Sequence, residues 1–245
     1  MTAAPAACPI PGMTSIEAAN LKRRIYGRRR GRKLRQGRQA LMTGALPRLA
    51  VTLPETGWLD PRTLFPAASR EIWLEIGFGA GEHLAAQAAA HPDIGMLGAE
   101  VFENGIAKLV NAVEVGALNN IRLFVDDAQL LLERLPDRCL GRVFILFPDP
   151  WPKERHKKRR MVAAATLDQL ARLMPDGSEL RLATDHAEYA EWMEAVLATR
   201  SDFAALAQGS GDWPQRPTDW PPTRYEEKAL ASGRTPRFFL YRRVG

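Results

Sequence analysis

The stretch Leu74-Glu75-Ile76-Gly77-Phe78-Gly79-Ala80-Gly81-Glu82 decides the fold of this chain. An apolar run over residues 72–76 ends in glycines spaced G-x-G-x-G, and a helix-like segment over residues 82–90 follows them. Glycines at a strand-to-helix turn allow tight curvature and let a ligand approach the backbone closely. The stretch therefore predicts a strand, a ligand-binding turn and a helix in succession.

Further apolar runs alternate with helix-like segments after this turn. The expected strands cover residues 72–76, 96–101, 121–125, 143–147 and 180–183, and the expected helices cover residues 82–90, 103–116, 160–174 and 187–199. Runs that are apolar on both faces suit a parallel sheet covered by helices, with ligands bound beyond the carboxyl ends of the strands. The pattern predicts an α/β fold with a doubly wound, mostly parallel, Rossmann-like sheet, to which residues 204–207 and 238–241 add two strands.

Positive charge is concentrated in two segments of the 245-residue chain, whose net charge is +6. Residues 22–38 hold ten Lys and Arg and no acid, and residues 153–160 hold six against one acid. The rest of the chain has 18 basic and 27 acidic residues, so its body is acidic. Such segregation is typical of a protein that meets a phosphate backbone, whereas a basic tail that only keeps the chain solvated is the simpler alternative for the first segment.

Residues 1–55 lack a periodic apolar pattern, so we expect a flexible basic arm there, followed by one domain over residues 56–245. We assign the arm to nucleic-acid phosphates alone, so its removal is expected to leave ligand binding at the glycine turn unchanged. No stretch approaches the roughly 18 apolar residues of a membrane span. Only Cys8 and Cys139 occur, so we expect no disulfide framework and no metal site. These features favour a cytoplasmic protein, and the sequence leaves monomer and homodimer both open.

Acidic residues follow the expected strands at their carboxyl ends. Glu75 precedes the glycines and Glu82 follows them, which suits a ligand with an amino group and a sulfonium rather than a pyrophosphate. Glu100 ends the second strand, where a carboxylate can accept hydrogen bonds from both hydroxyls of a ribose. Asp127 ends the third strand and is a candidate acceptor for an adenine amino group, although spacing alone does not separate it from Asp126.

The fourth strand runs into Phe147-Pro148-Asp149-Pro150-Trp151-Pro152-Lys153, and the second basic segment follows. Two prolines stiffen this turn and hold Asp149 at the strand end, facing the ligand crevice. We therefore expect the second substrate to lie beside Asp149.

These motifs together resemble one family, the tRNA (guanine-N7-)-methyltransferases, which have the class I methyltransferase fold. The resemblance rests on Leu74–Gly81, Gly98–Val101, Asp127-Ala128, Phe147–Trp151, the basic run to Arg160, Ala183–Asp185 and Thr223–Glu226. It implies S-adenosylmethionine as the cofactor, tRNA as the partner, and methyl transfer to N7 of a variable-loop guanosine, position 46 of the tRNA.

The resemblance also implies roles for single residues. The implied cofactor-binding residues are Glu75, Gly77, Gly79, Glu100, Asp127 and Asp149, with Asp149 also catalytic; the implied guanosine-binding residues are Lys153, Asp185, Thr223, Arg224, Tyr225 and Glu226; the implied RNA-binding residues are Arg155, Lys157, Lys158, Arg159 and Arg160. Glu227 departs from the family, which often has a basic residue there, and residues 228–236 look idiosyncratic.

Other interpretations of the whole chain stay open. The same cofactor can serve another RNA, a protein or a small molecule, although the basic segments count against the last two. A non-catalytic RNA-binding protein on this fold is disfavoured by the intact Glu75, Glu100 and Asp149. A nicotinamide-dependent oxidoreductase is disfavoured by the glycine spacing and by the lack of an evident hydride-handling arrangement.

Some single residues also suit purely structural roles. Asp185 is a candidate N-cap for the helix over residues 187–199 as well as a guanosine contact. Trp213 and Trp220 suit either stacking on a base or anchoring their loop. His83 and His91 are expected to be neither catalytic nor metal ligands.

Overall fold

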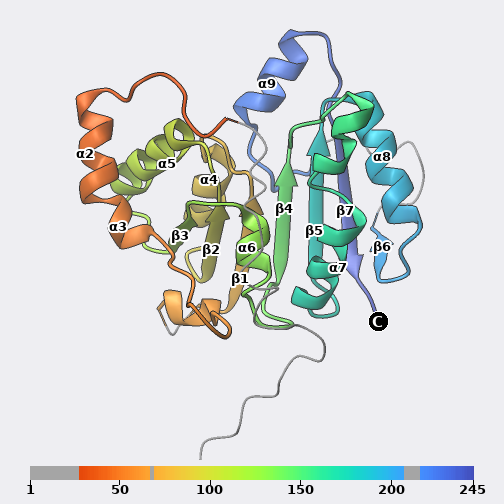
Figure 1. Cartoon of the computed structure of the whole chain (residues 1–245), viewed down its shortest axis with the longest axis horizontal. Helices are drawn as coiled ribbons and strands as arrows, with labels where there is room; N and C mark the ends of the chain where they lie inside the picture. Colours follow the sequence, from red (N-terminus) through yellow and green to blue (C-terminus); the bar gives the residue numbers. More distant parts are fainter. Residues whose placement is uncertain (1–27, 67–68, 207–215) are drawn as a thin grey trace, which may run out of the picture.

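The computed structural model describes residues 28–66, 69–206 and 216–245, and within them a seven-stranded sheet forms the centre of the molecule (Figure 1). The strands are β1 (Glu71–Ile76), β2 (Ile94–Ala99), β3 (Ile121–Phe124), β4 (Arg142–Leu146), β5 (Glu179–Thr184), β6 (Phe203–Ala205) and β7 (Arg237–Arg243). Their order is β3-β2-β1-β4-β5-β7-β6, and β7 alone runs antiparallel to the other six strands. The predicted mostly parallel, Rossmann-like fold of class I methyltransferases is confirmed.

The order of the strands reverses at β1, which lies between β2 and β4. Glu75 of β1 is opposite Gly98 on one side and Phe144 on the other. In open α/β sheets, ligands bind in the crevice outside the carboxyl ends of the strands at such a switch point. The glycine turn after β1 and the Pro-Asp-Pro turn after β4 therefore begin on the two sides of this crevice.

Helices cover both faces of the sheet (Figure 1). One face carries α4 (Glu82–Ala90) and α5 (Glu103–Gly116), and the other carries α6 (Ala128–Leu132), α7 (Ala164–Leu173) and α8 (Ala187–Ala198). Ile72, Leu74 and Ile76 of β1 join the core beneath α6–α8, whereas Trp73 joins the core beneath α4 and α5. Because side chains alternate across a strand, Glu75 belongs to the α4 side.

The connections after β4 and before β7 differ from the expected pattern. The 3-10 helix η2 (Glu154–Arg159) follows the Pro-Asp-Pro turn, so the helix expected over residues 160–174 begins only at Ala164. A further helix, α9 (Arg224–Ala231), lies over the carboxyl edge of the sheet and was not predicted (Figure 1). A short 3-10 helix, η1 (Pro61–Leu64), precedes β1.

Residues 36–51 differ from the predicted flexible arm. They form α2 (Gln36–Gly44), α3 (Leu46–Leu49) and a β-bridge from Ala50 to Leu123 of β3. Leu49 and Val51 are buried, and α2 packs against α5. The arm prediction is wrong for this segment, because a few widely spaced apolar residues dock on a neighbouring helix without leaving a periodic signal. Residues 1–27 lie outside the described part of the chain.

Candidate active site

The predicted glycine turn bends the chain sharply from β1 into α4. Gly77, Gly79 and Gly81 have φ angles of 73°, 56° and 78°, in the left-handed region that favours glycine. A side-chain carbon at Gly81 would also lie 2.7 Å from Leu109 of α5. At Gly77 such a carbon would meet no atom within 4 Å. The turn therefore leaves room at Gly77 for a ligand to approach the backbone.

Glu75, the predicted cofactor carboxylate at the end of β1, is held by a histidine from α4. Oε2 of Glu75 lies 2.8 Å from Nδ1 of His83, and the two side chains are 4% and 2% exposed. The ring of His83 packs edge-on against Phe144 of β4, with centroids 4.7 Å apart. His83 received no functional role from its sequence context, yet it orients the carboxylate. The sequence feature that could have revealed this pair is the position of the two residues: Glu75 lies on the face of β1 that α4 covers, and His83 lies in the first turn of α4.

Glu100, the residue predicted to bind the ribose, lies directly after β2, and its carboxylate joins two loops. Its Oε2 accepts a hydrogen bond from the N–H of Gly79 at 2.8 Å, and its Oε1 accepts from the N–H groups of Val101 and Phe102 at 2.7 and 2.9 Å. Burial raises the pKa of this carboxyl group, although the three hydrogen bonds oppose the rise. A carboxylate oxygen can accept more than one hydrogen bond, so Glu100 can still receive hydroxyl donors.

The two aspartates after β3 have different partners. Asp127 is the N-cap of α6 and accepts from the N–H of Gln129 at 3.0 Å. Asp126 accepts from the N–H of Asp127 at 2.9 Å, and its Oδ1 lies 3.9 Å from the guanidinium of Arg29. Both carboxylates lie at the carboxyl end of β3, so both stay candidates for the adenine contact.

The turn after β4 has a strained backbone. Phe147 and Trp151, on either side of Pro148-Asp149-Pro150, have φ angles of 51° and 44°. Large side chains rarely adopt this left-handed region, and such strain persists where the surrounding structure imposes it, most often at functional sites. Asp149 is exposed within this turn, and partial desolvation raises the pKa of its carboxyl group. The turn thus fixes one carboxylate at the edge of the crevice.

Arg160 is buried beneath the strained turn. Its side chain is 0% exposed, its Nε donates to the carbonyl oxygen of Pro150 at 2.9 Å, and its guanidinium pairs with Glu188 at 3.2 Å. The same guanidinium lies 4.9 Å from the ring centroids of Tyr189 and Trp192. The prediction that Arg160 contacts RNA is therefore wrong, because a fully buried guanidinium cannot reach a phosphate. Arg160 supports the turn instead.

Two other members of the predicted RNA-binding run have protein partners. Nζ of Lys157 pairs with Glu154 at 2.7 Å and with Glu188 at 2.9 Å. The guanidinium of Arg159 lies over the ring of Trp151, 5.0 Å from its centroid. These contacts hold η2 against α8 and against the strained turn.

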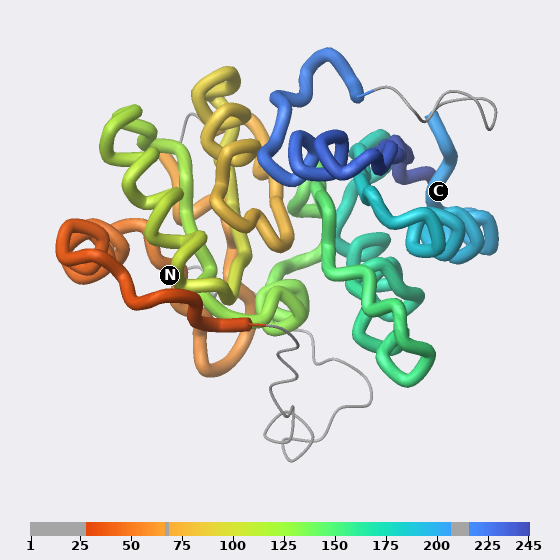
Figure 2. Tube along the Cα trace, turned by 90° about the horizontal axis from the view of Figure 1, so that it is seen from above, coloured from red at the N-terminus to blue at the C-terminus, as the bar shows by residue number. Residues whose placement is uncertain are grey.

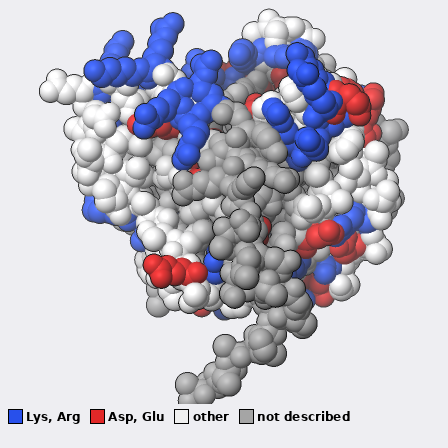
Figure 3. All heavy atoms as spheres, in the orientation of Figure 1, with Lys and Arg blue, Asp and Glu red and all other residues white. Residues whose placement is uncertain are grey.

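The remaining cations gather beside the carboxyl ends of the strands. Lys153, Arg155 and Lys158 are exposed after β4, and so are the Lys and Arg residues of the segment 28–38. Figure 3 shows these cations along the upper edge of the molecule, in two groups. The two basic segments of the sequence therefore lie at the same edge of the fold, one on each side of the crevice.

The Tyr225 ring at the start of α9 reaches back to both turns of the crevice. It stacks on Phe147, with ring centroids 6.4 Å apart and an interplanar angle of 15°. A side-chain carbon at Gly79 would lie 3.0 Å from the same ring. Three motifs that are far apart in the sequence thus meet at Tyr225.

The neighbours of Tyr225 in the predicted guanosine motif differ in exposure. Arg224 is exposed, whereas Thr223 is buried and caps α9 by accepting from the N–H of Glu226 at 3.2 Å. Oε1 of Glu226 pairs with Nε of Arg216 at 3.1 Å. Among the described residues, no hydrogen-bond partner lies near the buried Oε2 of Glu226. A buried acceptor without a partner is rare in proteins and suits a ligand donor.

Asp185, which follows β5, is not the N-cap of α8. The cap is His186, whose Nδ1 accepts from the N–H of Tyr189 at 3.4 Å, and Thr184 accepts from the N–H of His186 at 3.2 Å. Asp185 pairs with Arg234 at 3.1 Å instead. The capping interpretation was therefore wrong, and the carboxylate lies beside the segment that follows α9.

Trp220 anchors the loop before α9 in the core. Because its ring is buried there, the alternative role, stacking on a base, is excluded. Its side chain is buried and packs edge-on against Phe238 of β7 and His83, with centroids 5.6 and 6.1 Å apart. Gln87 of α4 donates to the carbonyl oxygen of Asp219 at 2.8 Å. The loop that leads to Tyr225 is therefore tied to the helix that orients Glu75. Trp213 lies outside the described residues.

Residues of the three motifs line one small cavity, whose walls include Glu75, Gly77, His83, Phe147 and Tyr225. Its volume is about 10 Å³, which is about the space that a single water occupies. The cavity is therefore too small to hold a nucleoside.

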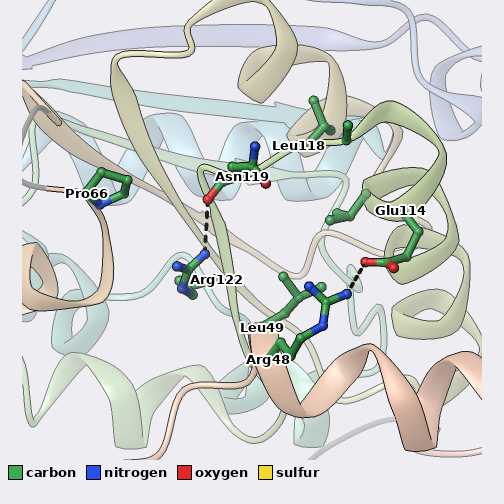
Figure 4. A pocket seen from close by; sticks show the side chains of 9 residues that line it. Arg48, Leu49, Pro66, Glu114, Leu118, Asn119 and Arg122 are labelled. Carbon is green, nitrogen blue, oxygen red and sulfur yellow. Dashed lines mark hydrogen bonds and ion pairs between the residues drawn. The ribbon is translucent and has the colours of Figure 1, made fainter.

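A larger cavity of about 520 Å³ lies at the opposite edge of the sheet, before β3 (Figure 4). Arg48 on its wall pairs with Glu114 at 2.7 Å. Arg122 donates to the carbonyl oxygens of Asn119 and Ile121 at 3.2 and 2.7 Å. Both cations of this cavity therefore have protein partners, and none of the predicted motifs reaches it.

Across residues 28–66, 69–206 and 216–245, no group of three or more His, Cys, Asp or Glu is placed to hold a metal ion. No helix in that part of the chain is long and apolar enough to cross a membrane.

Burial raises the pKa of Cys139 to about 12, so this thiol stays protonated at neutral pH.

Known proteins resemble this chain over most of its length. Residues 69–238 match the family described as "Putative methyltransferase". A tRNA (guanine-N(7)-)-methyltransferase of Rhodospirillum rubrum is 50% identical over 225 residues, which cover 90% of this chain and 88% of that protein. Proteins of the same name from Paramagnetospirillum magneticum and Zymomonas mobilis are 50% and 44% identical, and the matches cover 92% and 91% of this chain and 95% of each relative.

Proposed function

This chain belongs to the tRNA (guanine-N(7)-)-methyltransferase family, and on that premise we propose that it transfers the methyl group of S-adenosylmethionine to N7 of a guanine in tRNA. The proposed acceptor is the variable-loop guanosine at position 46 of the tRNA, and the proposed compartment is the cytoplasm. The observation that carries the proposal is the position of Tyr225, which contacts the glycine turn and the strained turn at once. A cofactor and an acceptor base bound at these two turns would be neighbours.

The acids and glycines of the crevice fit the chemistry of the cofactor. The buried carboxylate of Glu75 suits the amino group of the methionine part, and the open space at Gly77 admits that part to the backbone. Glu100 would accept from the ribose hydroxyls, and Asp127 or Asp126 would accept from the adenine amino group. Carboxylates at this end of the sheet also complement a cationic ligand.

The acceptor atom explains why the site needs few proton-transfer groups. N7 of guanine has a free lone pair and no proton, so no general base has to create the nucleophile. Bound S-adenosylmethionine supplies an electrophilic methyl group, whose carbon bonds to N7 while the C–S electron pair stays on sulfur. The charge moves to the purine, so the protein must chiefly orient the base and stabilise this charge.

We assign the orientation of the base and the stabilisation of its positive charge to the carboxylate of Asp149. The strained turn fixes it beside the crevice, where it can accept hydrogen bonds from N1–H and the N2 amino group of guanine. The Oε2 of Glu226, which has no hydrogen-bond partner among the described residues, is a second candidate acceptor for these donors, and Asp185 is a third. Exposed Lys153, Arg155 and Lys158 would neutralise phosphates around the base.

Incubation of the purified protein with labelled S-adenosylmethionine and bulk tRNA tests the proposal. We expect label in tRNA as N7-methylguanine, mapped to the variable loop by cleavage at the modified base. Label at another base, or label only in ribosomal RNA offered in parallel, would contradict the proposed substrate.

A further inference from the structure

The described end of the basic arm crosses the adenosine side of the proposed cofactor site. Residues 28–35 run from α2 along the start of α5 toward α6 (Figure 2). The carbonyl oxygen of Arg29 accepts from the N–H of Glu103 at 2.9 Å. The side-chain amide of Asn104 accepts from the N–H of Gly31 at 2.7 Å and donates to the carbonyl oxygen of Arg32 at 2.7 Å. We name residues 29–32 the strap.

The strap contacts Asp126, one of the two candidates for the adenine contact, and the loop that holds Glu100, the carboxylate assigned to the ribose. The guanidinium of Arg29 is 3.9 Å from Asp126 after β3. On the other side, the strap packs on the loop that follows Glu100: a side-chain carbon at Gly31 would lie 3.1 Å from the ring of Phe102 and 2.7 Å from Oδ1 of Asn104. The same loop donates two N–H groups to Glu100. The backbone of the strap is therefore in direct contact with the structure that holds this carboxylate.

We propose that the strap is one wall of the adenosine part of the cofactor site, and that Asn104 is the positioning residue that docks it there. This inference rests on the proposed cofactor site. It revises the expectation that removing the arm leaves cofactor affinity unchanged, because a wall of the site contributes to binding.

Few hydrogen bonds hold the strap in its docked position, so a bound ligand can shift its docking equilibrium. Three hydrogen bonds stabilise the docked backbone, and the conformational entropy lost on ordering four residues opposes docking with a free energy at least as large. A ligand that contacts only the docked form shifts such an equilibrium toward docking. By linkage, docking strengthens the binding of that ligand to the same extent.

The strap also connects the proposed cofactor site with the edge of the fold where the cations of the two basic segments are exposed. Its backbone carries the docking contacts, while the side chains of Arg29 and Arg30 are 51% and 87% exposed. Exposed guanidinium groups can neutralise phosphates. A strap that docks on cofactor binding would therefore order these cations before tRNA arrives.

Two point variants of the full chain, each with a matched control, test the proposal. Asn104→Ala removes both amide hydrogen bonds, and Asn111→Ala changes an exposed asparagine of the same helix. Gly31→Ala pushes the strap away from Asn104, whereas a side-chain carbon at Gly37 of α2 meets nothing within 4 Å, so Gly37→Ala is its control. By calorimetry with S-adenosylhomocysteine, we expect Kd to rise about fivefold or more in the first member of each pair and to stay within about twofold in the controls.

Limited trypsin digestion gives a readout that loss of fold would not imitate. We expect saturating S-adenosylhomocysteine to slow cleavage after Arg29, Arg30 and Arg32 in the unmodified chain and in Asn111→Ala, and to give no protection in Asn104→Ala. Unchanged affinity in both Asn104→Ala and Gly31→Ala, or no protection in the unmodified chain, would overturn the proposal. If Glu100→Ala also binds the ligand like the unmodified chain, the proposed cofactor site fails, which is a separate outcome.

Discussion

Nδ1 of His83 lies 2.8 Å from Oε2 of Glu75, and this buried pair joins α4 to the end of β1 directly beneath the glycine turn. The same histidine ring touches Trp220, which anchors the loop that leads to Tyr225. One side chain therefore braces the proposed amine-binding carboxylate and the approach to the guanosine motif.

We predict that His83→Ala weakens cofactor binding by about tenfold, because Glu75 loses a hydrogen bond in a buried position and is no longer held in one orientation. His91→Ala is the control, since His91 lies at the far end of α4 and packs on Trp73. Calorimetry with S-adenosylhomocysteine measures both variants. Equal affinities for the two would show that the pair has no part in orienting Glu75.

We predict that Asp149→Ala keeps the fold but loses methyl transfer by at least about a hundredfold in kcat/KM, as expected when a fixed group that stabilises transition-state charge is removed. Asp149 is exposed in a turn, so the free energy of unfolding should change by less than about 0.5 kcal/mol. Single-turnover assays and thermal unfolding measure the two effects. Substantial turnover by the folded variant would contradict the role of Asp149.

We predict that Glu100→Ala weakens cofactor binding by about 1–3 kcal/mol, the usual cost of losing hydrogen bonds to a charged group. A pH dependence follows from the raised pKa of this carboxyl group. The ionised carboxylate accepts hydrogen bonds from the ribose hydroxyls, and it becomes protonated as pH falls through the raised pKa. Cofactor affinity should therefore begin to fall at a pH above the usual pKa range of a glutamate.

Calorimetric titrations of the unmodified chain and of Glu100→Gln between about pH 5 and pH 8 check this dependence. The glutamine variant cannot titrate at this position, so the difference between the two curves isolates Glu100. A difference that stays constant over this range would contradict the assignment.

The strands and the acids at their ends were predictable because both follow from short-range pattern. Apolar runs buried on both faces predict parallel strands, and the carboxyl ends of such strands lie on one edge, so Glu75, Glu100 and Asp149 fall beside one crevice. The strain at Phe147 was not predictable, because a left-handed φ at a large residue is imposed by tertiary structure.

Contacts between distant segments were the part that sequence reasoning missed. In a basic run, an arginine beneath a turn looks the same as its exposed neighbours, and only the packing of Tyr189 and Trp192 distinguishes Arg160. The docking of the strap on Asn104 likewise depends on one side-chain amide that no periodic pattern reveals.

Arg160 and Lys158 are two residues apart in one basic run, and we predict opposite phenotypes for them. Arg160→Ala removes a buried guanidinium that donates to Pro150 and pairs with Glu188, so it should lower the free energy of unfolding by about 1–3 kcal/mol. Because Glu188 is half-exposed, the loss should stay below that of a fully buried ion pair.

Lys158→Ala should leave stability within about 0.5 kcal/mol. It should instead flatten the log–log salt dependence of tRNA binding by a slope of about 0.7–0.9, the contribution of one phosphate contact. Denaturant unfolding and filter binding at several salt concentrations, with Arg160→Ala kept at a temperature where it is folded, measure the two effects. A reduced salt slope in folded Arg160→Ala, with an unchanged slope in Lys158→Ala, would reverse the assignment of the two side chains.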